Sequence, residues 1–485
     1  MKKDRRTFIK DISTISLSLG LVPTALAAKD SSKSKKKVPD LIADPKAIRI
    51  GVIGCSGRAK TNIKEFKAIG QKLTALCDVD SSSRVTNVLK ENGLDHLNVY
   101  SDYRKFFEKE HKNLDAVVVS TPDVSHFGIS MMAIKYGLPV YVEKPMCHSI
   151  SQIRMITKEA KERNVVTQMG NQSHSKDGIH ICNEWIKAGL IGKVREVSIW
   201  TDRPYAGGTS IISTIRKKYK GLSDEIPVPE TLNWDAWQST ASVAPLRDYV
   251  LPSRWRVWWK YGSGALGDIG CHMLDIPVFA LGLGMPSKVV SRQFGGTKHY
   301  CAQQEVVEFY FDTTNQGVPL KISWYSGAIN KSKAKDFPDF QYDMLPNAPE
   351  EYAKTGNSID RVLGNGMFIV GDSGVLFSPT MHLGGAPTLL PKAKYTDLKE
   401  GNKLPEAELR YEGGNHYINF VKAVRGEEIA SSNFEYASKL TEIAQLGNLS
   451  LRTNSTIEWD AATMTCKNNP EANALVNEEL RDTWY

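Results

Sequence analysis

Two residues four positions apart, Asp268 and His272, have side chains suited to acid–base chemistry. On a helix this spacing puts both side chains on one face. The unperturbed pKa of an imidazole lies near neutral pH, so His272 is a candidate general base for a hydroxyl group. Asp268 could orient that imidazole or bond a neighbouring hydroxyl. Taken alone, His272 would more readily be read as a histidine buried in a protein core.

A second candidate site follows the apolar run AIRIGVIG, where the chain continues CSGRA. Aligned on the dinucleotide-binding fingerprint, Gly54, Ser56 and Ala59 take the places of its three glycines. Serine and alanine depart from that pattern, but an expected strand precedes the motif and an expected helix follows it, as nucleotide binding requires. We expect Gly54, Ser56, Gly57, Arg58 and Ala59 to hold a pyrophosphate at the start of that helix.

Asp78 ends the next apolar run, 21 residues after Gly57. A carboxylate at this position can accept hydrogen bonds from an adenosine ribose and would repel a 2′-phosphate. Asp78 therefore favours NAD over NADP, although the nearby Arg84 weakens that preference. The alternative is an ordinary turn or helix N-cap aspartate.

The helices and strands that must position these residues show two different hydrophobic patterns along the sequence. From residue 47 to 170, short apolar runs alternate with helical patterns, which predicts an α/β fold with an N-terminal Rossmann domain and a doubly wound parallel sheet. In residues 171–485, runs such as SKVVSRQF, EVVEFYF and PLKISWYS alternate with a period of two. This second pattern predicts a C-terminal α+β domain with a large open, mainly antiparallel sheet.

The first 27 residues have the features of a twin-arginine (Tat) signal peptide. Arg5 and Arg6 precede a short, weakly apolar run that ends in the small-residue sequence Ala25-Leu26-Ala27. We expect the chain to fold in the cytoplasm and to be exported to the periplasm by the Tat translocase. A Lys/Ser-rich linker, residues 28–46, would follow the signal. A disordered basic tail is the alternative.

The net charge, the cysteine spacing and the length of the apolar run argue against several classes of protein. The 485 residues carry a net charge of +8. Residues 1–27, with five Lys/Arg and two acids, contribute +3 of it, and a further lysine cluster lies in the linker. No nucleic-acid partner is therefore expected. The seven cysteines share no CxxC spacing, so we expect no metal site and no disulfide framework. The apolar run is too short for a stable membrane anchor.

Two further motifs, VYVEKP and GALGDIGCHMLD, resemble those of the glucose–fructose oxidoreductase, inositol dehydrogenase and rhizopine-catabolism (Gfo/Idh/MocA) family. In that family a Glu-Lys-Pro closes a Rossmann strand and an Asp-x-x-x-His lies on a helix of the second domain. Here they match Glu143-Lys144-Pro145 and Asp268 to His272. The resemblance covers residues 48–282 and extends to the segment NHYINFVKAVRG.

The resemblance implies a tightly bound NAD, with NADP less favoured, and a homodimer or homotetramer formed through the open sheet. The catalytic residues that it implies are Lys144, Asp268 and His272, with Lys144 donating a hydrogen bond to the reacting oxygen after a cis peptide bond. Taken alone, Lys144 would more readily be read as an exposed charge at a strand end. The additional cofactor contacts that it implies are Thr121, Pro122, His126, Glu143 and Lys144. His126 could instead cap its own helix.

For the substrate we expect a sugar or glycoside, because sugars stack on aromatic rings and the run RWRVWWKYG lies shortly before Asp268. The expected substrate contacts are Asn171, Trp258, Asp268 and His272. About half of the aromatic residues in this region would be structural instead.

These expectations combine into an exported NAD-dependent oxidoreductase that transfers a hydride between a retained nicotinamide cofactor and a secondary hydroxyl of a sugar or glycoside. Free NAD is expected to be scarce outside the cytoplasm, so the cofactor would be loaded before export. One alternative is a redox-neutral enzyme that cleaves glycosides by oxidation and elimination. Another is a non-enzymatic exported sugar-binding protein, which loss of Lys144 or His272 would have favoured.

Overall fold

The computed structural model describes residues 46–201, 209–219, 221–327, 365–380, 382, 384–467 and 469–485. The expected signal peptide, and all of the expected linker except its last residue, lie outside this part of the chain. Within it, no helix combines the length and the apolar character that crossing a membrane would require.

Six parallel strands form the first sheet, in the order β3-β2-β1-β4-β5-β6. They are β1 (Arg49–Ile53), β2 (Lys72–Cys77), β3 (Val99–Tyr100), β4 (Ala116–Val119), β5 (Val140–Val142) and β6 (Thr167–Met169). All four residues of β4, an Ala-Val-Val-Val run, are buried. Such a run is typical of a parallel strand that is covered on both faces.

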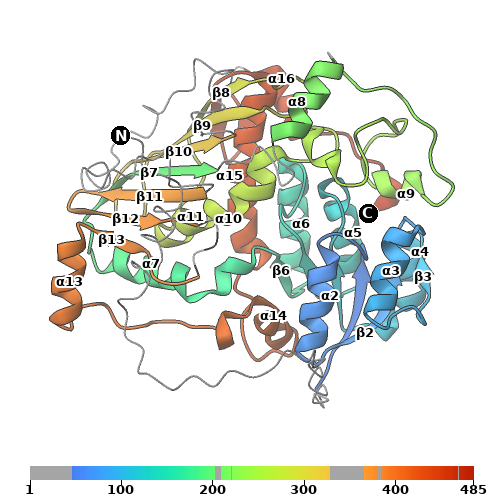
Figure 1. Cartoon of the computed structure of the whole chain (residues 1–485), viewed down its shortest axis with the longest axis horizontal. Coiled ribbons are helices and arrows are strands. Elements are labelled where there is room, and N and C mark those ends of the chain that lie inside the picture. Colours follow the sequence, from blue (N-terminus) through green and yellow to red (C-terminus); the bar gives the residue numbers. More distant parts are fainter. Residues whose placement is uncertain are drawn as a thin grey trace, which may run out of the picture. The chain divides into compact units, whose positions relative to one another are not determined.

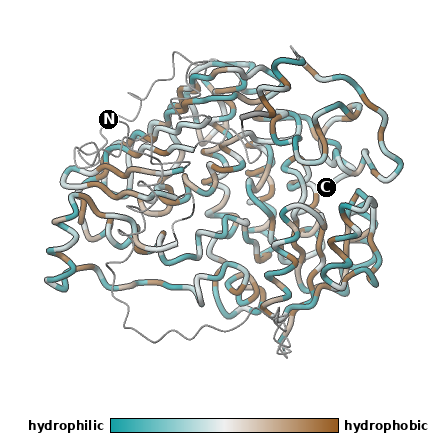
Figure 2. The backbone as a smooth tube through the Cα atoms, in the orientation of Figure 1, coloured by the Kyte–Doolittle hydropathy of each residue, from teal (hydrophilic) through white to brown (hydrophobic). Residues whose placement is uncertain are grey.

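Helices cover both faces of this sheet, which confirms the predicted doubly wound Rossmann fold (Figure 1). One face carries α2 (Ala59–Ala68), α3 (Ser83–Glu91) and α14 (His416–Val424). The other face carries α4 (Tyr103–Glu110), α5 (Asp123–Lys135) and α6 (Ile150–Glu162). Hydropathy alternates along α2 and α3 (Figure 2), and their apolar side chains are the buried ones.

Nine strands of the described residues form the second sheet, in the order β13-β12-β11-β7-β10-β9-β8-β14-β15. They are β7 (Val194–Thr201), β8 (Lys288–Phe294), β9 (Gln304–Phe311), β10 (Leu320–Ser326), β11 (Asn365–Gly371), β12 (Gly374–Ser378), β13 (Thr388–Leu390), β14 (Ile457–Asp460) and β15 (Thr465–Cys466). The β7–β10 pair is parallel and the other described pairs are antiparallel. The predicted large, mainly antiparallel sheet is thus confirmed.

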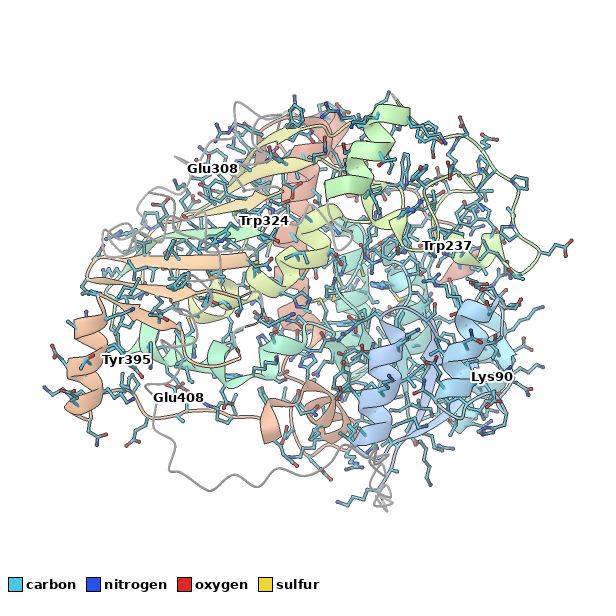
Figure 3. All side chains as sticks on the ribbon, in the orientation of Figure 1. Lys90, Trp237, Glu308, Trp324, Tyr395 and Glu408 are labelled. Carbon is cyan, nitrogen blue, oxygen red and sulfur yellow. The ribbon has the colours of Figure 1, made fainter. Side chains whose placement is uncertain are left out.

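The longest described helix, α15 (Phe434–Thr453), lies between the two sheets. It packs against α6 and β6 on one side and against β8 and β9 on the other (Figure 1). Trp324 of β10, labelled in Figure 3, is fully buried in the same continuous core. The remaining helices are α7 (Asp177–Lys187), α8 (Thr209–Lys218), α9 (Trp234–Gln238), α10 (Cys271–Met273), α11 (Asp275–Ala280), α13 (Lys392–Glu400) and α16 (Pro470–Val476).

Helix α14 returns from the C-terminal part of the chain to the Rossmann sheet. Its Phe420 is fully buried, with its ring centroid 6.2 Å from that of Phe66 and 5.6 Å from that of Tyr141. Because these rings come from α2 and β5, the first domain is incomplete without a helix that lies about 250 residues later in the chain.

Substitution Phe420→Ala should therefore destabilise the protein by about 3–5 kcal/mol, since it leaves a cavity beside the rings of Phe66 and Tyr141. Denaturant unfolding followed by tryptophan fluorescence measures this change. As a control, Ile429→Ala removes a side chain that is 80% exposed and should change stability by no more than about 0.5 kcal/mol. Equal effects of the two substitutions would contradict the packing of α14.

Candidate active site

The loop between β1 and α2 has room for a phosphate group. Gly54 has φ +83°, and a Cβ atom at this residue would lie 2.8 Å from the carbonyl oxygen of Ser120, so a side chain does not fit. Gly57 has φ +60°, and the nearest atom to an added Cβ would be an Arg84 nitrogen at 3.8 Å. The loop backbone is therefore open to a ligand at Gly57.

Three backbone N–H groups of this loop, those of Ser56, Gly57 and Arg58, have no hydrogen-bond partner within the described residues. The next N–H, that of Ala59, is already bonded to the carbonyl oxygen of Ser56 at 3.1 Å. Unpartnered N–H groups at a helix N-terminus suit an anion. The residues present thus fit the pyrophosphate of a dinucleotide.

Asp78 lies directly after β2, where its carboxylate is held by two backbone N–H groups. Oδ2 accepts from Cys55 at 2.7 Å and Oδ1 accepts from Asp80 at 3.0 Å. Burial raises the pKa of Asp78 to about 6, against the opposing effect of these hydrogen bonds. The carboxylate is therefore fixed at the strand end, as ribose recognition requires.

A cavity of about 720 Å³ extends from this loop into the second domain. Of the predicted cofactor contacts, those that line it are Gly54, Ser56, Gly57, Arg58, Asp78, Thr121, Pro122, Glu143 and Lys144. The second domain contributes residues from several separate segments, including Trp237, Trp255, Arg256, Asp268 and His272. The structure therefore brings Lys144, Asp268 and His272 to the same cavity as the phosphate-binding loop.

Lys144 and Asp268 form an ion pair in the cavity wall. The Lys144 ammonium donates to the Asp268 carboxylate at 2.7 Å and to its backbone carbonyl at 2.7 Å. The two side chains are 13% and 8% exposed, so water screens the pair little. Arg256 adds a second, longer contact to the same carboxylate oxygen, at 3.3 Å.

Asp268 lies on a π-helical turn, Leu266–Gly270, rather than on the regular α-helix that the spacing predicts. Such turns occur often at functional sites. The Lys144–Pro145 peptide bond is cis, as the resemblance implies.

His272, on α10, is buried against the ion pair and lines the cavity. Burial, Lys144 and His382 together hold its pKa well below the usual 6.5, so the imidazole is neutral at pH 7. Its Nδ1 has no hydrogen-bond partner among the described residues. Its ring centroid lies 4.7 Å from that of His382, in an edge-to-face arrangement.

Glu143, at the end of β5, ties the loop to both domains. One of its oxygens accepts hydrogen bonds from Arg58 at 3.2 Å, Asn62 at 2.9 Å and Gln172 at 3.1 Å. A Cβ at Gly170 would lie 2.9 Å from this carboxyl group, so glycine is required there. Glu143 therefore holds the side chains of Arg58 and Gln172 in place, and both of these residues line the cavity.

The structure does not bring Asn171 or Trp258, the two other predicted substrate contacts, to the cavity wall. The Asn171 amide donates to the buried carboxylate of Asp275 at 2.9 Å. The Trp258 indole N–H donates to the carbonyl of Tyr249 at 2.6 Å, and the ring packs edge-to-face on Tyr300. Both side chains thus satisfy buried groups of the second domain.

Two of the predicted cofactor contacts also lie outside the cavity lining. His126 bonds the carbonyl oxygens of Pro145 and Thr121, at 2.7 and 2.9 Å, and thereby links the two loops instead of capping its helix. Ala59 is fully buried at the start of α2, where a small side chain permits close packing.

Trp255 and His382 are among the cavity residues that the sequence did not assign to the site. Trp255 belongs to the aromatic run that suggested Trp258, but the repeated tryptophans do not reveal which ring faces the cavity. His382 lies 110 residues after His272 in a loop without any motif, so no sequence signal could have identified it.

Comparisons with known proteins agree with this architecture. Residues 48–171 match the NAD-binding Rossmann fold of the Gfo/Idh/MocA oxidoreductase family, and residues 215–294 match that family's C-terminal alpha/beta domain. The chain is therefore similar to both domains of this oxidoreductase family, and its first domain has an NAD-binding Rossmann fold.

Curated relatives match part of the chain. A "Glycosyl hydrolase family 109 protein" of Solibacter usitatus is 30% identical over 206 residues, which are 40% of this chain and 44% of that protein. An "Alpha-N-acetylgalactosaminidase" of Shewanella oneidensis is 27% identical over 207 residues, 39% of this chain and 44% of that protein. The matches thus span less than half the length of these relatives.

Among solved structures, the WlbA dehydrogenase of Bordetella pertussis, in complex with NADH and UDP-GlcNAcA, has the same fold. Its TM-score is 0.54 at 15% identity, over 85% of this chain and 99% of that one.

Substitution Asp78→Asn should weaken NAD binding and reduce the preference for NAD over NADP, because an amide has no charge to repel a 2′-phosphate. A hydrogen bond to a charged group contributes about 1.5–3 kcal/mol, or about 10- to 150-fold in Kd. Titration calorimetry on nucleotide-depleted protein measures both affinities. Asp95→Asn, at an exposed aspartate, is the control. An unchanged ratio of the two Kd values in Asp78→Asn would contradict the role of Asp78.

Proposed function

We propose that this chain is an exported NAD-dependent oxidoreductase, which transfers a hydride between a tightly bound nicotinamide cofactor and a secondary hydroxyl of a sugar or glycoside. The observation that carries the proposal is the buried Lys144–Asp268 pair beside His272, in the cavity that begins at the phosphate-binding loop. Both family domains that match this chain come from oxidoreductases.

His272, Lys144 and Asp268 each have a separate role in the proposed reaction. The phosphate-binding loop and Asp78 would hold NAD, which when bound would supply the acceptor for the hydride of the substrate C–H. Neutral His272 accepts the proton of the hydroxyl group, so that a carbonyl forms as both hydrogens leave the alcohol. Lys144 donates a hydrogen bond to the reacting oxygen and stabilises the negative charge that develops on it. Asp268 holds the Lys144 ammonium in place from the opposite side.

The wall contributed by the second domain supports a sugar as the substrate. Trp237 and Trp255 present aromatic surface to the cavity, on which the C–H face of a sugar can stack. Arg256, whose guanidinium lies 4.3 Å from the Trp255 ring, adds hydrogen-bond donors beside Asp268. This combination of apolar rings and a few polar groups is typical of a small-molecule site.

Retention of the cofactor is supported by a segment that we name the cover segment, residues 229–238. Five of its residues line the cavity, namely Pro229, Thr231, Leu232, Ala236 and Trp237. It is hydrogen-bonded to the loop that follows Asp78, through Ser81 N–H to Thr231 at 2.9 Å and Asn233 N–H to Val79 at 2.8 Å. A bound nucleotide would therefore leave only after these contacts open.

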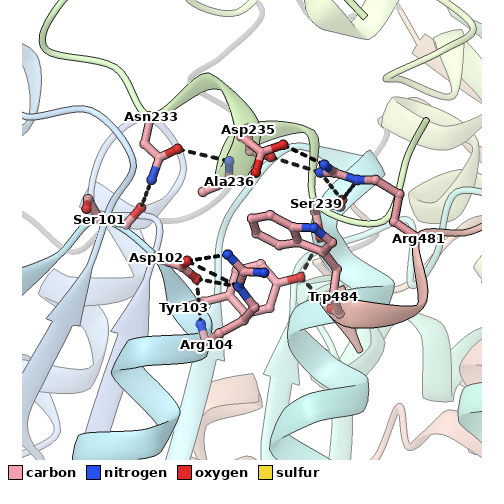
Figure 4. Close-up of polar contacts among 10 residues, drawn as sticks. All are labelled: Ser101, Asp102, Tyr103, Arg104, Asn233, Asp235, Ala236, Ser239, Arg481 and Trp484. Atoms are coloured by element: carbon pink, nitrogen blue, oxygen red, sulfur yellow. Dashed lines mark hydrogen bonds and ion pairs between the residues drawn. The ribbon is translucent and has the colours of Figure 1, made fainter. Parts of the chain in front are cut away.

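The C-terminus fastens the cover segment to the Rossmann domain (Figure 4). The Arg481 guanidinium bonds Asp235 and the carbonyl oxygen of Ser239. The Trp484 ring stacks 3.6 Å from the Arg104 guanidinium of α4, and its carbonyl accepts from the Tyr103 hydroxyl at 2.6 Å. These contacts connect three segments that are far apart in sequence, which supports slow exchange of the cofactor.

The proposal also includes export to the periplasm and assembly into a homo-oligomer. Export by the Tat translocase to the periplasm rests on the paired arginines and the run that follows them. The homodimer or homotetramer rests on the family resemblance and would form through the second sheet, on which Trp200, Phe368, Phe377 and Leu390 make a separate buried cluster. Partly exposed Tyr325, Val370 and Val375 extend this cluster.

The second candidate function is redox-neutral cleavage of a glycoside, in which the hydride returns to the sugar after elimination. The names of the curated relatives favour it, since one is a glycosyl hydrolase family 109 protein and another an alpha-N-acetylgalactosaminidase. Both functions share the same hydride-transfer step.

Substitution Lys144→Met should lower the rate of reduction of the bound nucleotide by about 100- to 1,000-fold, because the hydrogen bond to the developing oxyanion is lost. The absorbance of reduced nicotinamide, followed in single turnovers with a panel of free sugars, methyl glycosides and inositols, measures this rate. Lys105→Met, at an exposed lysine of α4, is the matched control. A Lys144→Met rate close to that of the control would contradict the proposed mechanism.

Substitution Arg481→Ala should increase the dissociation rate of NADH about 10-fold, the equivalent of one hydrogen bond to a charged group. The loss of nicotinamide fluorescence after dilution into a nucleotide trap measures the rate. Arg163→Ala removes a surface arginine that pairs with Glu159 of α6 and serves as the control. An unchanged rate in Arg481→Ala would show that the cover segment does not retain the cofactor.

A further inference from the structure

We propose that Arg256 determines the substrate class of the cavity and selects a sugar with a carboxylate group, such as a hexuronic acid, over the matching neutral sugar. The proposal rests on the proposed function and deepens it, because it names the substrate of the same site. Three features of the Arg256 guanidinium support it, namely its position, its hydrogen-bond partners and its charge.

Arg256 reaches the cavity from the short helix Arg254–Val257. Its Nε donates to Oδ1 of Asp268 at 3.3 Å, the same carboxylate oxygen to which Lys144 donates at 2.7 Å. A Cβ at Gly262 would lie 2.5 Å from the Arg256 Cα, so glycine there permits the two backbones to pack together. A substrate whose hydroxyl bonds Lys144 is therefore within reach of the Arg256 guanidinium.

The terminal nitrogens of this guanidinium are available to a ligand. Nη2 donates no hydrogen bond to any described residue, and Nη1 makes a long contact of 3.4 Å to the Ser253 carbonyl oxygen. The guanidinium carbon lies 4.3 Å from the centroid of the Trp255 ring, which supports one side of the group. The side chain is 25% exposed and lines the cavity, so an anion can approach these nitrogens from the cavity.

Positive charge exceeds negative charge around Arg256. Lys144 and Arg256 are both cations, and they share the single negative charge of the Asp268 carboxylate. His272 adds no charge at pH 7, because burial and the nearby Lys144 hold its pKa well below 6.5. One carboxylate cannot offset two cations, so an anionic substrate would supply the second negative charge.

The other acids that line the cavity have partners of their own. Glu143 pairs with Arg58 at 3.2 Å. Asp123 is 6% exposed, accepts a backbone N–H at 3.1 Å and is the first residue of α5, where the helix N-terminus stabilises a negative charge. Asp78 and Asp80 follow β2 at the nucleotide end, and both accept backbone N–H groups. None of these four carboxylates bonds Arg256.

A carboxylate suits the free edge of a guanidinium better than a hydroxyl does. Its two oxygens can accept two parallel N–H bonds, and these charge-assisted bonds are stronger than neutral ones. In a hexuronic acid the carboxylate is attached to the same ring as the secondary hydroxyls, so one molecule can bond both Arg256 and Lys144. A neutral sugar would displace water from the guanidinium without replacing the charge, which disfavours its binding.

The test compares matched ligands on the holoenzyme by titration calorimetry. The probes are methyl glucuronide with methyl glucoside, and methyl galacturonide with methyl galactoside, which differ only in a carboxylate that replaces the primary alcohol. The wild-type protein should bind each uronide about 10- to 150-fold more tightly than its neutral partner, the range for a hydrogen bond to a charged group. In Arg256→Gln this ratio should fall below about threefold. Arg256→Lys keeps the charge but not the planar fork, and should retain part of the ratio.

Arg254→Gln is the matched control. The Arg254 guanidinium lies 4.8 Å from the Tyr249 ring, and this residue does not line the cavity. The ratio of the two Kd values in this variant should equal that of the wild-type protein. Since each ratio is measured within one protein sample, a smaller folded fraction in a variant does not change it.

An unchanged ratio in Arg256→Gln would overturn the role of Arg256. Tighter binding of a sulfate ester of methyl galactoside than of the galacturonide would overturn the choice of a carboxylate. A wild-type protein with no preference in either pair would overturn the inference, and reduction of its nucleotide by the neutral sugars would then leave the proposed oxidoreductase standing. If the uronides bind through Arg256 but no sugar reduces the nucleotide, the proposed function fails and the carboxylate site remains.

Discussion

The buried ion pair between Lys144 and Asp268 is the contact on which the rest of the site depends. Its two charges come from different domains, and each is mostly removed from water. Removing one partner of such a pair leaves an uncompensated buried charge, which costs about 3–5 kcal/mol. The two domains must therefore be packed closely enough to bring these groups to 2.7 Å of each other. The same packing brings His272 to the cavity wall.

Helix α15 supplies much of that packing. It contacts the π-helical turn that carries Asp268, and a Cβ at its Gly447 would lie 2.5 Å from a Leu266 methyl group. Within the turn, a Cβ at Gly267 would lie 2.2 Å from the Cβ of Ser263. Glycine at 447 lets the turn approach the helix, and glycine at 267 lets the turn pack against Ser263 and against Pro145, the residue after Lys144. These tight contacts hold Asp268 at a fixed distance from Lys144, which lies two residues after the end of β5.

The sequence was most informative where the determinants are local. Periodic apolar runs predicted both sheets, and short motifs predicted that Gly54, Asp78, Lys144 and His272 would serve one site; all four line one cavity. It was least informative where a polar side chain had several possible partners. Asn171 is bonded to the buried Asp275, and Trp258 to a backbone carbonyl, because burial of those acceptors requires donors. His382 and the C-terminal contacts of Arg481 depend on folding across more than 100 residues, which no local pattern encodes.

The central claim is that the chain retains NAD for hydride transfer to and from a sugar. The most direct measurement is to purify the mature protein without adding nucleotide, denature it, and identify what is released by mass and absorbance. The account predicts NAD or NADH in an amount stoichiometric with the protein. Release of NADP would contradict the role of Asp78, and protein that carries no nucleotide would contradict the retained cofactor itself.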